Sequence, residues 1–214
     1  MPERFPAERL RGLYAVTPDE ADTARLLTLA ARVLEGRPAL LQYRNKLASP
    51  ALRREQAQAL LVLCRAAGVP LLINDDLGLA LEIGADGAHL GRDDGDPAAA
   101  RAVLGPGRIL GVTCYGDFER ARQGADAEAD YVAFGAMFAS PSKPQAPRAP
   151  FELLARARRE LQLPVAAIGG ITLYNAGQVV EAGADLLAVI NDVFAAADPA
   201  ARAAAYRPLF GLPP

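Results

Sequence analysis

Short apolar runs alternate with longer amphipathic segments along most of the chain. The runs are rich in Val, Ile and Leu and have the length of buried strands, whereas the longer segments, such as 21–36, have helical periodicity. The predicted strands are residues 12–16, 39–43, 70–74, 87–90, 108–113, 130–135, 164–169 and 186–190. Continuously apolar strands separated by helices indicate a parallel sheet covered on both faces. Eight such units can close into a TIM (β/α)8 barrel.

Local signals agree with these boundaries. Ser49 precedes a proline at the first position of a predicted helix, and Gly68 ends that helix. The segments LEIGADGAHL and VEAGADLLAV repeat one unit, in which a helix ends at Gly84 or Gly183 and turns through Ala-Asp into a strand. A weaker third copy lies around Gly124. We interpret these glycines as left-handed joints between helix and strand, and not as functional residues.

A doubly wound open sheet is the alternative to the barrel. No Gly-x-Gly-x-x-Gly opens a helix after any predicted strand, which removes the main reason to favour a dinucleotide-binding fold. The chain has 214 residues, of which 51% are hydrophobic, and this suits one large core. We therefore predict an α/β fold with a single TIM-barrel domain over residues 1–214, in which residues 1–11 form a short N-terminal extension.

Composition limits the class of ligand. The formal net charge of -2 provides no basic field for general nucleic-acid binding, so a small anionic ligand is expected. Cys64 and Cys114 are too few for a disulfide framework and lack metal-ligand spacing. The start of the chain does not have the pattern of a signal peptide, and no apolar run reaches membrane-spanning length. We expect a cytoplasmic protein without membrane partners; whether it forms a homo-oligomer is left open.

Candidate chemistry lies just after the predicted strands, where TIM barrels carry their active sites. After the second strand, alternation along an extended chain places Gln42, Arg44 and Lys46 on one side. Two cations and an amide at this spacing are suited to an anion with several oxygens.

Two acidic pairs follow the next two strands. Asp75-Asp76 and Asp93-Asp94 come from adjacent strands, so their carboxylates can meet at the mouth of the barrel. Magnesium is typically bound by one or two carboxylates together with substrate phosphate oxygens, which predicts a metal-diphosphate site. Asp-Asp after a strand is also an ordinary helix N-cap, as Asp96 before a proline illustrates. Spacing alone leaves both interpretations open.

The later strands are followed by candidate phosphate-binding loops. Residues 138–150 contain four prolines, two serine hydroxyls, Lys143 and Arg148, and form either a binding loop or a plain surface loop. The glycines of 169–172 allow a ligand to approach the backbone closely. Residues 189–192 lead toward a helix N-terminus, and the last two loops form the customary phosphate site of a barrel.

Seven motifs in this order resemble the thiamine-phosphate synthase family: QYRNK, INDD, HLGRDD, GVT, DYVAFG with SPSK, IGGIT with Asn175, and VIN. The match extends from about Leu13 to Phe210. The resemblance implies a TIM-barrel transferase that joins 4-amino-2-methyl-5-(hydroxymethyl)pyrimidine diphosphate to a thiazole phosphate, commonly in its carboxylated form. It implies the products thiamine phosphate and pyrophosphate, phosphorylated small-molecule substrates, and Mg²⁺ as cofactor.

The same resemblance implies roles for individual residues. The expected ligands of the pyrimidine diphosphate are Gln42, Tyr43, Arg44, Asn45, Lys46, Asn74, Thr113 and Lys143. Those of the thiazole phosphate are Ser140, Pro141, Ser142, Gly170, Ile190 and Asn191. Magnesium is expected on Asp75 and Asp94. Arg44, Lys46 and Lys143 would act in catalysis by stabilising charge on the departing diphosphate, and no protein nucleophile is required.

Some positions depart from the family pattern. SPSK stands where the family often has threonines, and Thr113 and Asn191 stand where serine is common; all of these keep hydrogen-bonding capacity. Asp76 occupies a position frequently filled by arginine, and it either weakens diphosphate binding or faces away. We interpret His89, the only histidine, as a structural residue and not a general base.

Two other functions compete with the synthase. The thiazole tautomerase branch shares the barrel, but its catalytic histidine would fall at Ala136, and that branch tends to lose the acid that Asp94 supplies here. A barrel that binds a phosphorylated thiamine precursor without catalysis is the other alternative. The full set of cations and acids argues against such a loss of activity.

Overall fold

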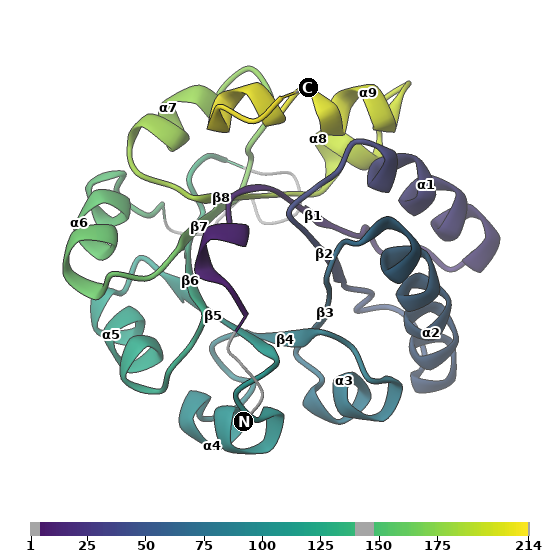
Figure 1. The fold of residues 1–214 in the computed structure, drawn as a ribbon, viewed down its shortest axis with the longest axis horizontal. Coiled ribbons are helices and arrows are strands. Elements are labelled where there is room, and N and C mark those ends of the chain that lie inside the picture. Colours follow the sequence, from purple (N-terminus) through teal and green to yellow (C-terminus); the bar gives the residue numbers. More distant parts are fainter. Residues whose placement is uncertain (1–4, 140–147, 214) are drawn as a thin grey trace.

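The eight strands pair in parallel and close into a barrel in chain order (Figure 1). This computed structural model describes residues 5–139 and 148–213. The strands are β1 (Gly12–Val16), β2 (Leu40–Tyr43), β3 (Leu71–Asn74), β4 (Gly87–Leu90), β5 (Ile109–Tyr115), β6 (Tyr131–Gly135), β7 (Val165–Ile168) and β8 (Leu186–Val189). The predicted TIM barrel is confirmed, and the predicted strand ends differ from these by at most two residues.

Helices surround the barrel on the outside (Figure 1). They are α1 (Thr23–Glu35), α2 (Pro50–Ala67), α3 (Leu77–Ile83), α4 (Pro97–Leu104), α5 (Phe118–Asp126), α6 (Glu152–Leu161), α7 (Ala176–Glu181), α8 (Asn191–Phe194) and α9 (Pro199–Ala204), with 3-10 turns η1 (Ala7–Arg9) and η2 (Arg207–Phe210). Ser49 caps α2 as predicted, accepting a hydrogen bond from the Leu52 amide at 3.2 Å. None of the helices in the described ranges is long and apolar enough to cross a membrane.

The prediction of left-handed glycines between helix and strand is confirmed at three positions and wrong at one. Gly68, Gly84 and Gly183 have φ angles of 68°, 69° and 111°, which glycine adopts without strain. Gly124 instead lies within α5, where a side chain would contact Val112 and Val132 of the sheet. The helix continues past Gly124 to Asp126, and Glu128 takes the left-handed conformation with φ 57° instead.

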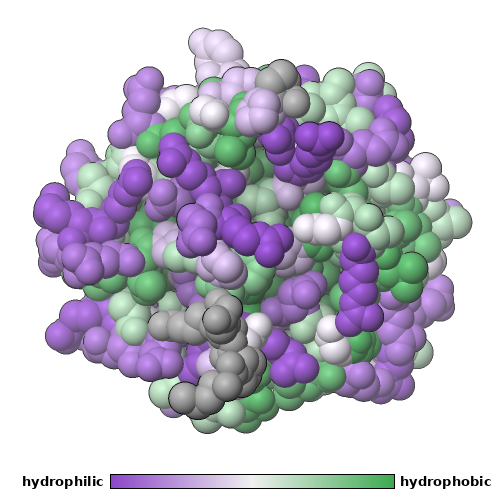
Figure 2. All heavy atoms as spheres, viewed as in Figure 1, coloured by the Kyte–Doolittle hydropathy of each residue, from purple (hydrophilic) through white to green (hydrophobic). Residues whose placement is uncertain are grey.

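The core has two parts. One fills the barrel interior with side chains such as Tyr14, Leu72 and Tyr131, and the other lies between the strands and the helices. Leu10 is buried in the inner part with Phe5 beside it, so the described end of the extension covers the amino-terminal opening of the barrel. Figure 1 shows η1 lying over the ring of strands, and Figure 2 shows hydrophilic side chains over much of this face.

Candidate active site

Residues 42–45, from the end of β2 into the following loop, alternate as predicted. Gln42 points into the barrel, where its amide nitrogen donates to the Tyr14 hydroxyl. Tyr43 and Asn45 point the other way, and both bond the Gln56 side chain of α2, at 2.9 and 3.1 Å. Gln42 therefore faces the interior while its neighbours fix the segment to α2.

Asp19, in the loop after β1, positions the cations of this segment. Its Oδ2 lies 3.0 Å from Arg44 Nη1, and its Oδ1 accepts a hydrogen bond from the Lys46 amide at 2.6 Å. Asp19 is absent from the residues predicted from sequence. The signal that could have found Asp19 is its position just after a strand, because the other candidates were chosen for lying just after strands.

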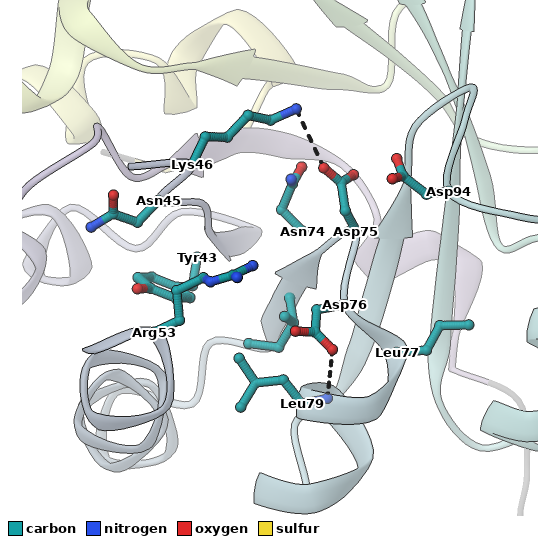
Figure 3. A pocket seen from close by; sticks show the side chains of 11 residues that line it. Tyr43, Asn45, Lys46, Arg53, Asn74, Asp75, Asp76, Leu77, Leu79 and Asp94 are labelled. Atoms are coloured by element: carbon teal, nitrogen blue, oxygen red, sulfur yellow. Dashed lines mark hydrogen bonds and ion pairs between the residues drawn. The ribbon is translucent and has the colours of Figure 1, made fainter. Parts of the chain in front are cut away.

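Asp75 and Asp94 come together at the carboxyl ends of β3 and β4. In Figure 3 the two carboxylates face each other, and Lys46 reaches toward Asp75, with Nζ 3.4 Å from Oδ2. Asp94 Oδ2 also accepts the Gly91 amide at 2.9 Å. Asp75 has φ 62°, a left-handed conformation that is uncommon outside glycine and often found at functional sites.

The electrostatics of this pair favour a bound cation. Partial burial and the neighbouring Asp75 carboxylate raise the pKa of Asp94, because each disfavours its charged form. In the described ranges no cluster of three or more His, Cys, Asp or Glu side chains could hold a metal. Two carboxylates suit magnesium, which fills its remaining positions with water and phosphate oxygens, better than they suit zinc.

The structure separates the two members of each acidic pair. Asp76 caps α3, and its Oδ1 accepts the Leu79 amide at 2.8 Å, whereas Asp75 caps no helix. Asp93 is exposed. The helix-cap interpretation therefore holds for Asp76, which is turned toward α3 (Figure 3). It also holds for Asp96, the N-cap of α4.

A cavity of about 490 Å³ opens beside these residues. Its lining includes Tyr43, Asn45, Lys46, Arg53, Asn74, Asp75, Asp76 and Asp94. Arg53 of α2, which was not predicted from sequence, extends into it over Tyr43 (Figure 3). Its Nε is the one buried side-chain N or O atom of the described residues without a hydrogen-bond partner. The cavity thus combines cations and carboxylates, as a metal-bound anion would require.

His89 and Thr113 stand on β4 and β5, next to the carboxylate pair, and the His89 carbonyl accepts the Asp75 amide at 2.8 Å. His89 Nε2 is 2.6 Å from the Thr113 hydroxyl, and Nδ1 is 2.8 Å from the Tyr131 hydroxyl. Burial lowers the pKa of His89 to about 4, so the ring is neutral near pH 7. Arg120, also missed from sequence, donates to the carbonyls of Thr113 and Gly91 at 2.7 Å each and ties β5 to the loop after β4.

The predicted thiazole-phosphate residues lie after β7 and β8. Gly170 has φ 63°, and any side chain there would collide with the backbone of Ala139. Asn175 fixes this turn through the Gly170 carbonyl and the Thr172 amide, at 3.0 and 2.8 Å. Ile190 and Asn191 stand at the start of α8, as predicted. The remaining predicted residues, Ser140, Pro141, Ser142 and Lys143, lie outside the described residues.

Comparison with known proteins decides the family. A family model described as thiamine monophosphate synthase matches residues 13–193. The chain belongs to the thiamine monophosphate synthase family. It is 65% identical to the thiamine-phosphate synthase of Azoarcus sp. (strain BH72), over 95% of this chain and 98% of that one. It is 63% identical to the thiamine-phosphate synthase of Aromatoleum aromaticum, over 96% and 99% of the two chains.

Solved structures agree with the family assignment. The thiamine phosphate pyrophosphorylase from Pyrococcus furiosus superposes with a TM-score of 0.84 at 27% identity, covering 96% of this chain and 98% of that chain. A 3-hexulose-6-phosphate synthase, at 23% identity and a TM-score of 0.65, shares the fold. Membership of the thiamine monophosphate synthase family confirms the resemblance seen in the sequence and places the chain among the transferases of thiamine biosynthesis.

Proposed function

We propose that the chain joins 4-amino-2-methyl-5-(hydroxymethyl)pyrimidine diphosphate to a thiazole phosphate and depends on Mg²⁺. The observation that carries the proposal is the facing pair Asp75 and Asp94 beside Lys46, at the edge of a cavity that Arg53 also lines. Family membership supplies the reaction class, and this pair supplies the reason to expect a metal-bound diphosphate.

The reaction breaks the bond between the pyrimidine methylene carbon and the diphosphate oxygen. The thiazole nitrogen then forms a new bond to that carbon, and pyrophosphate leaves with the bonding electrons. The electron-rich aminopyrimidine ring delocalises the positive charge that develops on the methylene. The protein therefore has two tasks: to stabilise negative charge on the leaving group and to align the two substrates.

Arg44 and Lys46 are suited to the first task. Asp19 holds the Arg44 guanidinium and the Lys46 backbone, and the Lys46 ammonium lies 3.4 Å from Asp75, so both cations face the site before substrate arrives. Asp75 and Asp94 would hold Mg²⁺, which would supply further positive charge to the diphosphate. The diphosphate would bind to a set of donors that is already arranged. This lowers the reorganisation needed in the transition state.

The second substrate is expected at the neighbouring turn. Gly170 follows β7, which lies opposite β3 in the closed barrel, and α8 follows the adjacent strand β8; Asp75 follows β3. This arrangement supports a thiazole phosphate on one side and the pyrimidine diphosphate on the other, with their reacting atoms over the barrel.

The test is a reaction of the two substrates with and without Mg²⁺, in which pyrophosphate and thiamine phosphate are both quantified by chromatography. We expect equal amounts of the two products and a loss of both on chelation. Asp94→Ala should lower kcat/KM by about 100-fold. Asp93→Ala is the matched control and should react like the unmodified protein, because Asp93 is exposed and lies outside the carboxylate pair. Absence of thiamine phosphate at every Mg²⁺ concentration would refute the proposal.

A further inference from the structure

Five polar side chains form one continuous hydrogen-bonded chain across the barrel interior. Gln42 Nε2 contacts the Tyr14 hydroxyl, which lies 2.6 Å from the Tyr131 hydroxyl. Tyr131 contacts His89 Nδ1 at 2.8 Å, and His89 Nε2 contacts the Thr113 hydroxyl at 2.6 Å. The two ends belong to the predicted pyrimidine site, whereas the three middle residues do not. The chain therefore connects two binding residues through the barrel.

The sequence makes room for this arrangement with a glycine. Gly111 of β5 stands between His89 of β4 and Tyr131 of β6 in the strand register. A Cβ atom at Gly111 would overlap the Tyr131 ring. With only hydrogen there, the rings of Tyr131 and His89 stack, with centroids 5.6 Å apart and planes at 17°. A glycine within a strand weakens that strand, so its presence here points to the importance of the ring it admits.

Counting hydrogens fixes the direction of every bond. The Gln42 amide nitrogen is a donor, and a tyrosine hydroxyl has one hydrogen to give. Because Tyr14 and Tyr131 are buried, each hydroxyl hydrogen needs an acceptor. Among the described residues the Tyr131 oxygen is the one left for Tyr14, so Tyr14 donates to Tyr131 and Tyr131 donates to His89 Nδ1. A neutral imidazole that accepts at Nδ1 carries its hydrogen on Nε2, so His89 donates to the Thr113 oxygen. The hydrogen of the Thr113 hydroxyl is then left without an acceptor among the described residues, and is free for a ligand.

The Gln42 end of the hydrogen-bonded chain presents an acceptor, whereas the Thr113 end presents a donor. Gln42 is 4% exposed and lies near the carboxyl end of β2, and its Nε2 is taken up by Tyr14. Among residues 5–139 and 148–213 its Oε1 accepts no side-chain hydrogen bond, so this oxygen is left as the acceptor at this end. Because each bond in the chain sets the direction of the next, the acceptor at Gln42 and the donor at Thr113 are coupled: neither can reverse unless all three middle residues reverse as well.

We propose that Tyr14, Tyr131 and His89 are positioning residues that fix this hydrogen-bond direction and make the site selective for an amino-pyrimidine over an oxo-pyrimidine. The inference rests on the proposed function. Gln42 Oε1 accepts from the exocyclic amine of the substrate, and the Thr113 hydroxyl donates to the substrate's diphosphate. A 4-oxo ring presents an acceptor where the amine presents a donor, so it leaves Gln42 Oε1 opposed by a second oxygen.

The test measures the dissociation constants of two probes by calorimetry. The probes are the 2-methyl-5-(hydroxymethyl)pyrimidine monophosphates with a 4-amino or a 4-oxo group, which isolate binding from turnover. The unmodified protein should bind the amino probe about 100-fold more tightly than the oxo probe. An acceptor in the site pairs with the amine, whereas the oxo group leaves that acceptor without a donor. Tyr131→Phe breaks the hydrogen-bonded chain at its centre. Tyr14 can then donate to Gln42 Oε1 once the Gln42 amide rotates, and this turns the amide nitrogen toward the ligand. We expect the preference to fall by about tenfold.

The matched control is Tyr206→Phe. Tyr206 is also buried, and its hydroxyl donates to Asp192 at 2.7 Å, outside the chain. Its loss should leave the amino preference unchanged. An unchanged preference in Tyr131→Phe, or an equal weakening of both probes, would overturn the inference, because a merely structural hydroxyl would behave in that way.

A second pair of variants covers the case in which Tyr131→Phe does not fold. His89→Gln keeps one donor and one acceptor in the chain, whereas His89→Leu keeps neither. We expect the amino preference to be largely retained in His89→Gln and lost in His89→Leu; equal preferences would overturn the inference. Amino preference without thiamine phosphate formation by the unmodified protein would refute the proposed function alone. Thiamine phosphate formation with an unchanged preference in the variants would refute the inference alone.

Discussion

Aspartates stand at both ends of this barrel and behave differently. At the amino-terminal end, Asp86, Asp130 and Asp185 each follow an alanine, enter a strand and accept the backbone amide of the preceding strand, at 2.8, 2.7 and 3.1 Å. At the carboxyl end, Asp75 and Asp94 face each other. The first group joins neighbouring strands, whereas the second places like charges together. The same residue type stabilises the fold where its partners are donors and forms a binding site where its partner is another carboxylate.

The bonds at the amino-terminal end account for the repeated Ala-Asp unit of the sequence. Each copy precedes an even-numbered strand, and its carboxylate bonds the odd-numbered strand before it, so the repeat connects the barrel in pairs. In the copy near Gly124 the helix does not end at the glycine, because α5 continues to Asp126. The aspartate of this copy is therefore Asp130. The aspartates at the amino-terminal end of the barrel are therefore structural, and their removal should lower stability more than activity.

The largest effect is expected at Asp130. Its carboxylate is 5% exposed and pairs with the buried Arg101 guanidinium as well as the Leu110 amide. Asp130→Ala leaves Arg101 buried without its partner, and should lower the free energy of unfolding by about 4 kcal/mol in urea denaturation. Activity per folded molecule should remain. A loss below about 1 kcal/mol would show that the amino-terminal carboxylates do not stabilise the barrel.

His89, between the two ends, should make stability depend on pH. Its pKa is lowered from 6.5 in the unfolded chain to about 4 in the fold, chiefly by burial. The unfolded chain therefore binds more protons between these values, and the stabilisation present above pH 6.5 is lost as the pH falls toward 4. The expected loss is about 3 kcal/mol. His89→Gln should remove this component from urea denaturation at pH 7 and pH 4; equal pH dependence in both proteins would contradict it.

At the carboxyl end, Asp75→Asn should have the opposite effect to that expected of Asp130→Ala. Asparagine tolerates the left-handed conformation of Asp75, so the backbone is retained while the charge is removed. We expect kcat/KM to fall by about 100-fold with little change in unfolding free energy. Asp76→Asn is the matched control, because asparagine also caps a helix well and α3 should be undisturbed. Similar activity losses in both variants would contradict the assignment of the metal to Asp75.

The smallest effect is expected at Asp19, which is 30% exposed. Asp19→Ala frees the Arg44 guanidinium and the Lys46 amide, so kcat/KM with the pyrimidine diphosphate should fall by about fivefold. Asp19→Asn retains an acceptor for the Lys46 amide and should recover part of the loss. An increase in kcat/KM for both variants would show that Asp19 acts as a competing negative charge and not as a support.

The sequence alone determined the barrel and the position of its chemistry. Apolar periodicity located all eight strands, and the signals at Ser49 and Gly68 located helix ends, because these depend on residues adjacent along the chain. The rule that active sites follow barrel strands was sufficient to find the Asp-Asp pairs. It could not choose Asp75 over Asp76, since both precede the same helix.

Only the tertiary structure decided which side chains meet. Asp19 approaches Arg44, and Tyr14 approaches Tyr131, across 25 and 117 residues of sequence. Barrel closure and strand register bring these groups together, and no local pattern encodes them. The direction of the buried hydrogen-bonded chain depends on all five of its members at once. Local propensities therefore specify the scaffold, whereas the polarity of the site arises from long-range contacts that exist only after the barrel has closed.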